Sequence, residues 1–234
     1  MRLAFQLLLA MTLLPAALSD AARAQGAPPA PAGPVHIATY VEVVNASIKD
    51  AAKLLEQYRD ASRKENGNLR AELAREIARP TRFVVLETWK DQAAFDAHGK
   101  SAGTTAFRDK LKAIQAGPYD ERIHVPLNVA ASDVLSGRRA VIVVSHVDVP
   151  PPRKDDCIAA LNPLADASRK GAGNQRFEVQ QQANRPNHFT VVEAWKDKKS
   201  YDGSRLGDAQ RQFRDKLGPM LGALYDERLY RVVE

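Results

Sequence analysis

His98 is the side chain of this sequence best suited to acid–base chemistry. It closes the segment VVLETWKDQAAFDAH, in which Trp89 and Phe95 precede it. Because Phe95 and His98 are three residues apart, a helix would present both on one side. A neutral imidazole accepts a proton from a weakly acidic hydroxyl near neutral pH, and an indole can stack on a flat ring or donate its N–H. The alternatives are a histidine that only interacts with the dipole of a helix end and a tryptophan that belongs to the core.

Glu87 shares a strand face with Trp89, because side chains two residues apart in a strand point the same way. A carboxylate on an otherwise apolar face needs a partner or a raised pKa. By residue type, the partners expected are Arg122 for Glu87 and Arg228 for Glu193. The pattern therefore predicts an ion pair in each half of the chain, with a general base as the alternative.

The chain is an internal repeat. A shift of 106 residues, from Trp89 to Trp195, aligns its two halves without a gap. Two copies of this length are too few and too long for a solenoid, so each copy is expected to be a small domain.

The halves differ at three positions that bear on chemistry. From the first half to the second, His98 becomes Ser204, Phe95 becomes Tyr201, and Tyr40 becomes His146. These exchanges indicate either relocated polar groups in a second pocket or drift in a half that serves as scaffold. If only one half is active, His98 favours the first.

Each half is predicted to have the element order β-α-β-β-α-α-β. In the first half we expect strands at 36–44, 69–78, 82–90 and 119–125, a helix with Ser47 as its N-cap, a short helix over 91–98 that Asp91 caps, and a helix over 104–115. Runs of β-branched residues predict most of the strands, and apolar residues at three- and four-residue steps predict the helices. The segment 69–78 has helical propensity, and we expect a strand there because its counterpart in the second half alternates Phe177, Val179 and Gln181. The order is that of the ferredoxin-like α+β fold, an antiparallel sheet with helices on one face.

A single sheet of this kind leaves one face bare, yet strands such as RFVVLETW are apolar on both faces. Two such sheets packed face to face would cover each other. The duplication therefore predicts an intrachain pseudo-dimer, a dimeric α+β barrel built from one chain. Further self-association of the chain is compatible with this arrangement.

The first residues have the pattern of a secretory signal peptide, with Arg2 before the short apolar run 3–18 and small residues around 22–24. We expect a signal peptide at 1–24, a Pro- and Ala-rich tether at 25–34, a first domain at 35–127, a linker at 128–140 and a second domain at 141–234. The expected location is periplasmic or secreted, with no membrane span in the mature chain.

Charge and cysteine content argue against several classes of protein. The chain has 34 Lys and Arg against 28 Asp and Glu, and the charges are interspersed, so no nucleic-acid partner is expected. The single cysteine, Cys157, excludes an internal disulfide and zinc sites built from paired cysteines. No metal site is predicted.

A short motif in the first half has the pattern F-x-V-x-E-x-W-x-D-x-x-A-F/Y-x-x-H. It is formed by Phe83, Val85, Glu87, Trp89, Asp91, Ala94, Phe95 and His98. This pattern resembles the antibiotic biosynthesis monooxygenase family of dimeric α+β barrels. The likeness extends over most of both halves, 35–127 and 141–233.

The resemblance implies a cofactor-free monooxygenase, in which a phenol or quinol is deprotonated and reacts directly with dioxygen between sheet and helices. Under this interpretation His98 is the base beside Trp89, and a small aromatic substrate contacts Phe95, Phe107, Tyr40, Trp195, Tyr201 and His146. Similar folds include haem-degrading enzymes, so a non-catalytic barrel that binds haem or another hydrophobic ligand is the alternative. A structural module without activity is the third interpretation.

Overall fold

The computed structural model of the protein describes residues 33–131, 135 and 139–233, so the predicted signal peptide and most of the predicted tether lie outside the described residues. The first half contains β1 (Val35–Glu42), the 3-10 helix η1 (Asn45–Ser47), α1 (Ile48–Ser62), β2 (Asn68–Glu76), β3 (Arg82–Trp89), α2 (Gln92–Gly99), α3 (Ala102–Lys112) and β4 (Asp120–Asn128). The second half contains β5 (Val141–Asp148), η2 (Pro151–Arg153), α4 (Lys154–Arg169), β6 (Asn174–Gln182), β7 (His188–Trp195), α5 (Lys198–Arg205), α6 (Asp208–Leu217), η3 (Gly218–Met220) and β8 (Asp226–Val232).

Both halves have the predicted order of strands and helices. The segment around β2 is a strand despite its helical propensity, as its counterpart β6 indicated. Ser47 stands at the N-cap of α1 as predicted, but its side chain makes no capping bond, because a 3-10 turn leads into the helix. Helix α3 begins at Ala102 rather than Thr104, since the hydroxyl of Ser101 accepts a bond from the Thr104 N–H at 3.1 Å.

The start of α2 is fixed by its cap and by a close glycine contact. The carboxylate of Asp91 accepts a bond from the Ala94 N–H at 2.8 Å, as predicted. Gly67, between α1 and β2, has φ +93°, and an added Cβ there would lie 2.7 Å from the Cβ of Ala94. The glycine therefore lets this connection pass directly against α2, which places His98 beside the end of α1.

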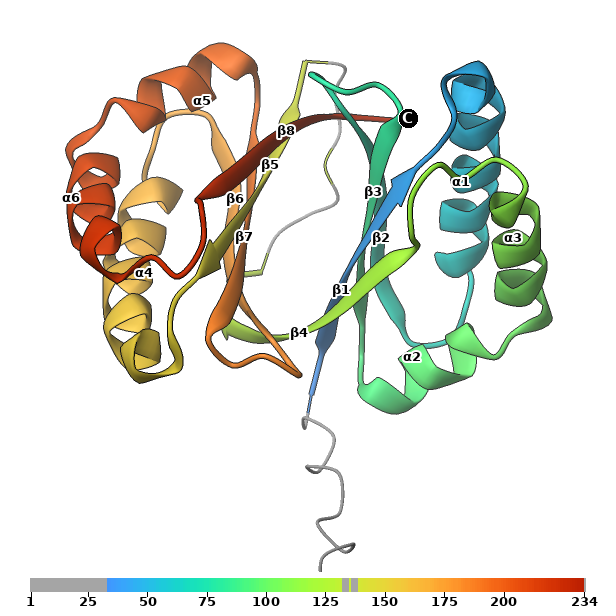
Figure 1. Ribbon diagram of the computed structural model, residues 1–234, viewed down its shortest axis with the longest axis horizontal. Coiled ribbons are helices and arrows are strands. Elements are labelled where there is room, and N and C mark those ends of the chain that lie inside the picture. Colours follow the sequence, from blue (N-terminus) through green and yellow to red (C-terminus); the bar gives the residue numbers. More distant parts are fainter. Residues whose placement is uncertain (1–32, 132–134, 136–138, 234) are drawn as a thin grey trace, which may run out of the picture. The chain divides into compact units, whose positions relative to one another are not determined.

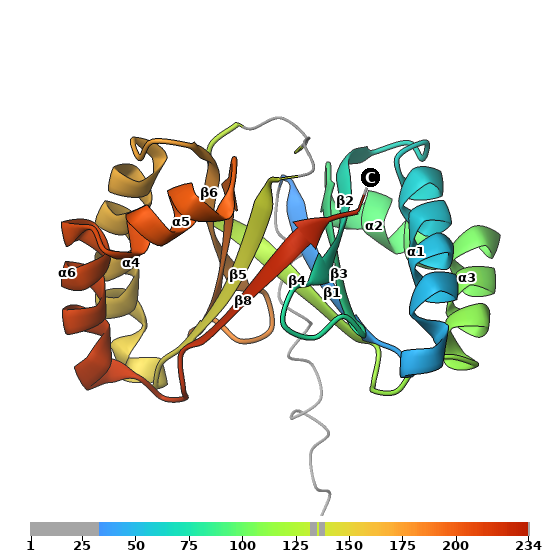
Figure 2. The same cartoon turned by 90° about the horizontal axis from the view of Figure 1, so that it is seen from above.

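The eight strands form one closed barrel in the order β1-β3-β2-β8-β5-β7-β6-β4. The predicted intrachain dimeric α+β barrel is confirmed, and side chains of the two halves' sheets pack against each other across its interior. In addition, the sheets join edge to edge, where β2 pairs with β8 and β4 pairs with β6, a closure that the sequence analysis did not predict. Closure removes the unpaired edges that two open sheets would expose. Helices α1, α2 and α3 cover the first half's sheet from outside, and α4, α5 and α6 cover the second half's (Figures 1 and 2).

Alternation along each strand separates the barrel interior from the face beneath the helices. Inside the barrel, the packed side chains include Ala38, Val84, Ile142 and Val192. Beneath the helices, the two outer cores include Leu55, Phe83 and Leu111 in the first half and Leu161, Phe189 and Phe213 in the second. Trp89 and Phe95 pack together on the outer face of the first half. Trp89 and Phe95, two of the residues predicted to contribute to a site, therefore lie between the sheet and the helices of the first half.

Part of the barrel interior is ionic. Arg176 donates to Glu72 at 2.6 Å and Arg70 pairs with Glu178 at 2.8 Å, so both ion pairs cross the barrel from β2 to β6. The backbone N–H of the buried Leu135 also donates to Glu72, at 2.8 Å. The linker was predicted as a polar connector, and at this residue it also packs into the barrel.

Two histidines lie close to these ion pairs on β1 and β4. Burial lowers the pKa of His36 to about 4 and that of His124 to about 3. Both imidazoles are therefore neutral at pH 7. His124 bonds to the hydroxyl of Thr190 at 2.9 Å, which ties β4 to the opposite half.

Across the described residues, no helix combines the length and the apolar character that crossing a membrane requires.

Candidate functional site

His98 lies near the end of α2 with its ring against the indole of Trp89. The ring centroids of His98 and Trp89 are 4.6 Å apart, and those of His98 and Phe95 are 6.3 Å apart. The side chain of His98 is almost fully buried, at 2% exposure. The predicted grouping of these three rings is confirmed, and it holds the imidazole in one orientation.

Both ring nitrogens of His98 are engaged by side chains from α1 and the turn after it. Nδ1 lies 3.0 Å from Oε2 of Glu65, and Nε2 lies 2.7 Å from the hydroxyl of Tyr58. The Glu65 carboxylate can only accept a bond, so it places the imidazole proton on Nδ1 and leaves Nε2 as the acceptor. The hydroxyl of Thr104 is 3.4 Å from each nitrogen. A carboxylate, an imidazole and a phenol are thus aligned for proton transfer.

Glu87 extends this line of polar groups into the core. Its Oε2 lies 3.4 Å from the Tyr58 hydroxyl, and burial raises its pKa to about 7. The predicted pairing with Arg122 is wrong, since Arg122 binds Asp120 at 2.7 Å. Arg122 stands opposite Ala38 in the register, so it shares the barrel-facing side while Glu87 faces the helices.

The same correction applies to the second half. Arg228 pairs with Asp226, and Glu193 instead accepts a bond from the indole N–H of Trp195 at 2.9 Å. Burial raises the pKa of Glu193 to about 7. In both halves the carboxyl group lies within hydrogen-bond distance of a neutral side chain, Tyr58 for Glu87 and Trp195 for Glu193. Arg205 and Arg214 act to lower the pKa of Glu193, but the effect of burial outweighs theirs.

A cavity of about 240 Å³ opens beside His98. Its lining includes Tyr58, Glu65, His98, Thr104 and Phe107. The rings of Tyr58 and Phe107 stack on each other with centroids 4.0 Å apart and form an aromatic part of the lining. Trp89 and Phe95 support the imidazole from behind and are not among the lining residues. The cavity therefore has room for a small molecule beside His98.

Tyr40 and His146 lie elsewhere, inside the barrel. The Tyr40 hydroxyl is 2.8 Å from Nε2 of His146, and Nδ1 of His146 is 3.3 Å from Asp226. The two residues are repeat equivalents that meet each other, so they do not contribute to the cavity beside His98. Tyr40 instead borders a smaller cavity of about 170 Å³ that also contains Arg228.

The described residues contain no cluster of three or more His, Cys, Asp or Glu side chains arranged to hold a metal ion.

Comparison with known proteins assigns the chain to a family. Residues 34–110 and 140–216 each match the model of the family described as Antibiotic biosynthesis monooxygenase. The chain belongs to this family. Each half is one family domain, as the internal repeat predicted.

Among curated proteins, this family member resembles the Bacillus subtilis (strain 168) protein named "Putative monooxygenase YcnE". The two are 37% identical over 59 residues, which span 25% of this chain and 62% of that protein, less than two thirds of its length. A solved structure of a monooxygenase-named protein from Fusobacterium nucleatum superposes with a TM-score of 0.79 and 17% identity, over 87% of this chain and 94% of that one. A second such structure, from Lactobacillus acidophilus NCFM, superposes with a TM-score of 0.71 and 13% identity, over 86% of this chain and 94% of that one. At these identities the structural likeness concerns the fold.

Three polar residues of the first family domain were missed by the sequence analysis: Tyr58, Glu65 and Thr104. None belongs to the motif around Trp89, and tertiary packing alone brings them to His98. The repeat nevertheless carried a signal. In the second domain their equivalents, with that of His98, are Leu164, Gly171, Gln210 and Ser204, so all four positions change together.

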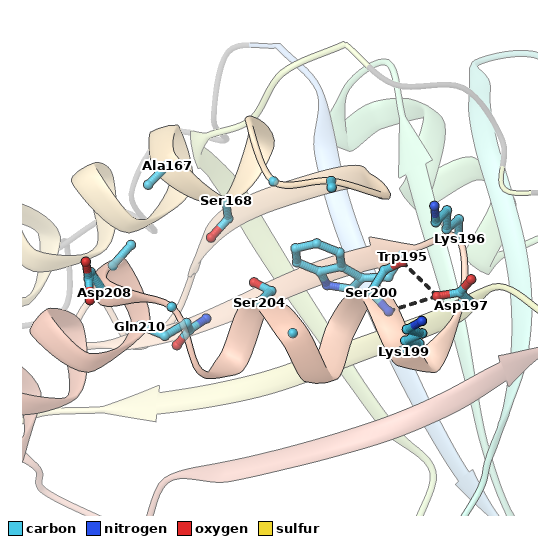
Figure 3. Close-up of a pocket in the computed structure, with 15 residues that line it drawn as sticks. Ala167, Ser168, Trp195, Lys196, Asp197, Lys199, Ser200, Ser204, Asp208 and Gln210 are labelled. Atoms are coloured by element: carbon cyan, nitrogen blue, oxygen red, sulfur yellow. Dashed lines mark hydrogen bonds between the residues drawn. The ribbon is translucent and has the colours of Figure 1, made fainter.

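The second family domain has the same scaffold but lacks the histidine, tyrosine and glutamate that line the cavity of the first. Trp195 and Phe213 repeat Trp89 and Phe107, but a cavity of about 660 Å³ stands where the first domain has its polar side chains. Figure 3 shows the indole of Trp195 beside this cavity, between Ser168 and Ser204. Tyr201 does not direct its hydroxyl into the cavity, because that hydroxyl donates to Glu227.

Proposed function

We propose that the first domain is a monooxygenase that acts on a small phenol or quinol with dioxygen and without a cofactor. The observation that carries the proposal is the alignment of Glu65, His98 and Tyr58 at the edge of a cavity that is lined in part by aromatic rings. Family membership supports the reaction class, and the cavity volume of about 240 Å³ favours a substrate of one or two rings.

His98 acts as the base in this proposal. Nε2 receives the proton of the substrate hydroxyl, either directly or through the oxygen of Tyr58. The Glu65 carboxylate, 3.0 Å from Nδ1, stabilises the imidazolium that forms. Trp89 and Phe95 keep the ring in place during this transfer.

The remaining chemistry uses the electrons of the substrate. The quinolate gives one electron to dioxygen, and the two radicals combine at a ring carbon to form a hydroperoxide. Loss of water then leaves a hydroxylated quinone. The sum is quinol plus dioxygen giving hydroxyquinone plus water, so no external reductant is required.

Oxygen isotopes test this stoichiometry. The mature chain is incubated with 2-methyl-1,4-naphthohydroquinone under ¹⁸O₂, and the products are analysed by mass spectrometry. We expect one ¹⁸O atom in 2-hydroxy-3-methyl-1,4-naphthoquinone and the other in water. Unlabelled quinone accompanied by labelled hydrogen peroxide would instead identify a two-electron oxidase and refute the proposal.

A titration with haemin separates the proposal from the haem-binding alternative. Tight binding would give a sharp shift of the Soret band that saturates at a stoichiometric amount of haemin. A spectrum that remains the sum of free haemin and protein is expected. A saturable shift would count against a cofactor-free reaction.

A further inference from the structure

We propose that the second domain binds the protein to the surface of anionic lipid bilayers through an exposed apolar patch. The patch consists of residues 150–152, just before α4, and residues 221–224, between η3 and β8. None of these residues lines the cavity beside His98 or the cavity beside Trp195. The inference therefore goes beyond the proposed reaction and holds whether or not the first domain oxidises quinols.

The two segments of the apolar patch lie against each other. The N–H of Gly222 donates to the carbonyl oxygen of Asp148 at 2.8 Å, and a Cβ added to Gly222 would lie 3.3 Å from Cδ of Pro150. Figures 1 and 2 both show the connection from α6 to β8 beside the start of α4. The first domain has the equivalent backbone bond, from Ala116 to Glu42 at 2.7 Å. The backbone of the patch is therefore held as it is in the other domain.

The leucines of the apolar patch are not buried by the fold. Leu224 is 93% exposed and Leu221 is 36% exposed. They are two of six large apolar side chains that are exposed among the described residues, and the other four occur singly: Val44, Leu69, Ile77 and Leu206. Gly222, Ala223 and the three prolines of the patch are exposed as well. An exposed apolar surface that is continuous in this way is typical of an interaction site.

The first domain has a more polar surface at the equivalent place. Under the shift of 106 residues, three of its polar side chains are replaced by apolar residues or glycine: Asn45, Lys112 and Gln115 become Pro151, Gly218 and Leu221. Leu224 stands where the first domain has Pro118. Because the backbone bond is the same in both domains, the replacements change the surface and leave the fold as it is.

The extent of the apolar patch favours a bilayer over a folded protein as its partner. A stable protein complex buries roughly 800 Å² on each partner. Here the apolar surface is confined to a few residues, because the exposed Arg153 follows the prolines directly and the exposed Lys216 lies just before the second segment. A bilayer requires no complementary shape. A few apolar side chains enter its headgroup region while neighbouring cations approach the lipid phosphates.

Charge favours anionic over neutral lipid. The residues that flank the patch on η2, the start of α4 and the last turn of α6 comprise four basic and three acidic side chains: Arg153, Lys154, Arg214 and Lys216, and Asp155, Asp156 and Asp215. The whole chain has a formal net charge of +6. Without residues 1–24, which contain two arginines and one aspartate, the charge is +5. A positively charged protein is attracted to a negatively charged bilayer before any side chain inserts.

Vesicle flotation tests the proposal. The protein is residues 25–234, which contain every described residue and lack the apolar run 3–18 that would itself bind lipid. The probe is a vesicle of phosphatidylglycerol and phosphatidylcholine in equal amounts. We expect the wild type to float with these vesicles and to bind less to vesicles of phosphatidylcholine alone. Leu224→Ser should weaken binding about 10-fold, since a leucine side chain no longer leaves water.

Leu206→Ser is the matched control. Leu206 is 75% exposed but precedes α6, whereas the second segment of the patch follows the end of that helix, so this variant should bind as the wild type does. The double variant Leu221→Gln/Leu224→Pro has the residues of the first domain at both positions and should bind no more tightly than Leu224→Ser.

Three results would overturn the inference. They are a wild type that does not float, equal binding by the wild type and both patch variants, and a Leu224-dependent dimer in sedimentation velocity without vesicle binding, which would identify a second copy as the partner. Oxygen uptake with a quinol should be the same in Leu224→Ser and the wild type, because the patch is separate from the cavity beside His98. The two proposals can therefore fail separately.

Discussion

Replacing Glu193 by Gln should stabilise the protein at alkaline pH and change little in acid. Burial raises the pKa of Glu193 from 4.5 to about 7. A raised carboxyl pKa means that the folded chain holds a proton that the unfolded chain has released, so stability falls as pH rises from 4.5 through 7. The resulting penalty is about 0.8 kcal/mol at pH 5 and about 3.3 kcal/mol at pH 8. A neutral glutamine escapes this penalty and can still accept the bond from Trp195.

Urea denaturation at the two pH values measures the effect. The advantage of Glu193→Gln over the wild type should increase by about 2.5 kcal/mol between pH 5 and pH 8. Glu56→Gln, at a partly exposed position of α1, is the control and should differ from the wild type equally at both pH values. A Glu193→Gln curve that runs parallel to the wild type across this range would show that the carboxyl is ionised without cost, contrary to its burial.

Three further predictions concern the other parts of the molecule. Because burial lowers the pKa of His124 to about 3, the folded protein loses stability as pH falls below 6.5. His124→Gln should reduce the loss of unfolding free energy between pH 7.5 and pH 5 by about 2 kcal/mol in urea titrations. The same loss in the variant as in the wild type would contradict a neutral buried imidazole. Gly67→Ala should cost roughly 1–3 kcal/mol because of the positive φ and the contact with Ala94, whereas Gly99→Ala, which meets no atom within 4 Å, should cost little in the same thermal melts. Glu65→Gln should slow oxygen uptake with a quinol roughly 10- to 100-fold, because the imidazolium of His98 would lose the negative charge beside it. A rate equal to that of the wild type would exclude Glu65 from proton transfer.

The sequence predicted the architecture well because the repeat constrained it twice. Where one copy was ambiguous, as in the helix-prone segment of β2, the other copy resolved the assignment. The cap at Asp91 is a local feature, so it could be predicted. Edge-to-edge closure of the sheets could not, since the pairing of β2 with β8 depends on how the two halves meet.

The site was predicted only where its residues are near in sequence. Trp89, Phe95 and His98 belong to one strand and the helix that follows it, and they do lie together. The partner of Glu87 was wrong because residue type does not reveal that Arg122 faces the barrel interior. Tyr58 lies 40 residues before His98, and only the packing of α1 against α2 and α3 joins them.

The difference between the domains now has a physical description. The first domain retains a carboxylate, an imidazole and a phenol at its cavity, whereas the second has lost all three and gained volume. The shared Trp89 and Trp195 therefore reflect the common scaffold, and the two cavities differ in the polar residues around these tryptophans.

The most direct test of this division of roles is the rate at which ¹⁸O-labelled hydroxyquinone forms in two matched variants. His98→Ala removes the base of the first domain, and Ser204→Ala changes the equivalent position of the second. His98→Ala should reduce the rate by about 100-fold or more, while Ser204→Ala should match the wild type. Equal rates in all three proteins, or a loss confined to Ser204→Ala, would contradict the assignment of catalysis to His98.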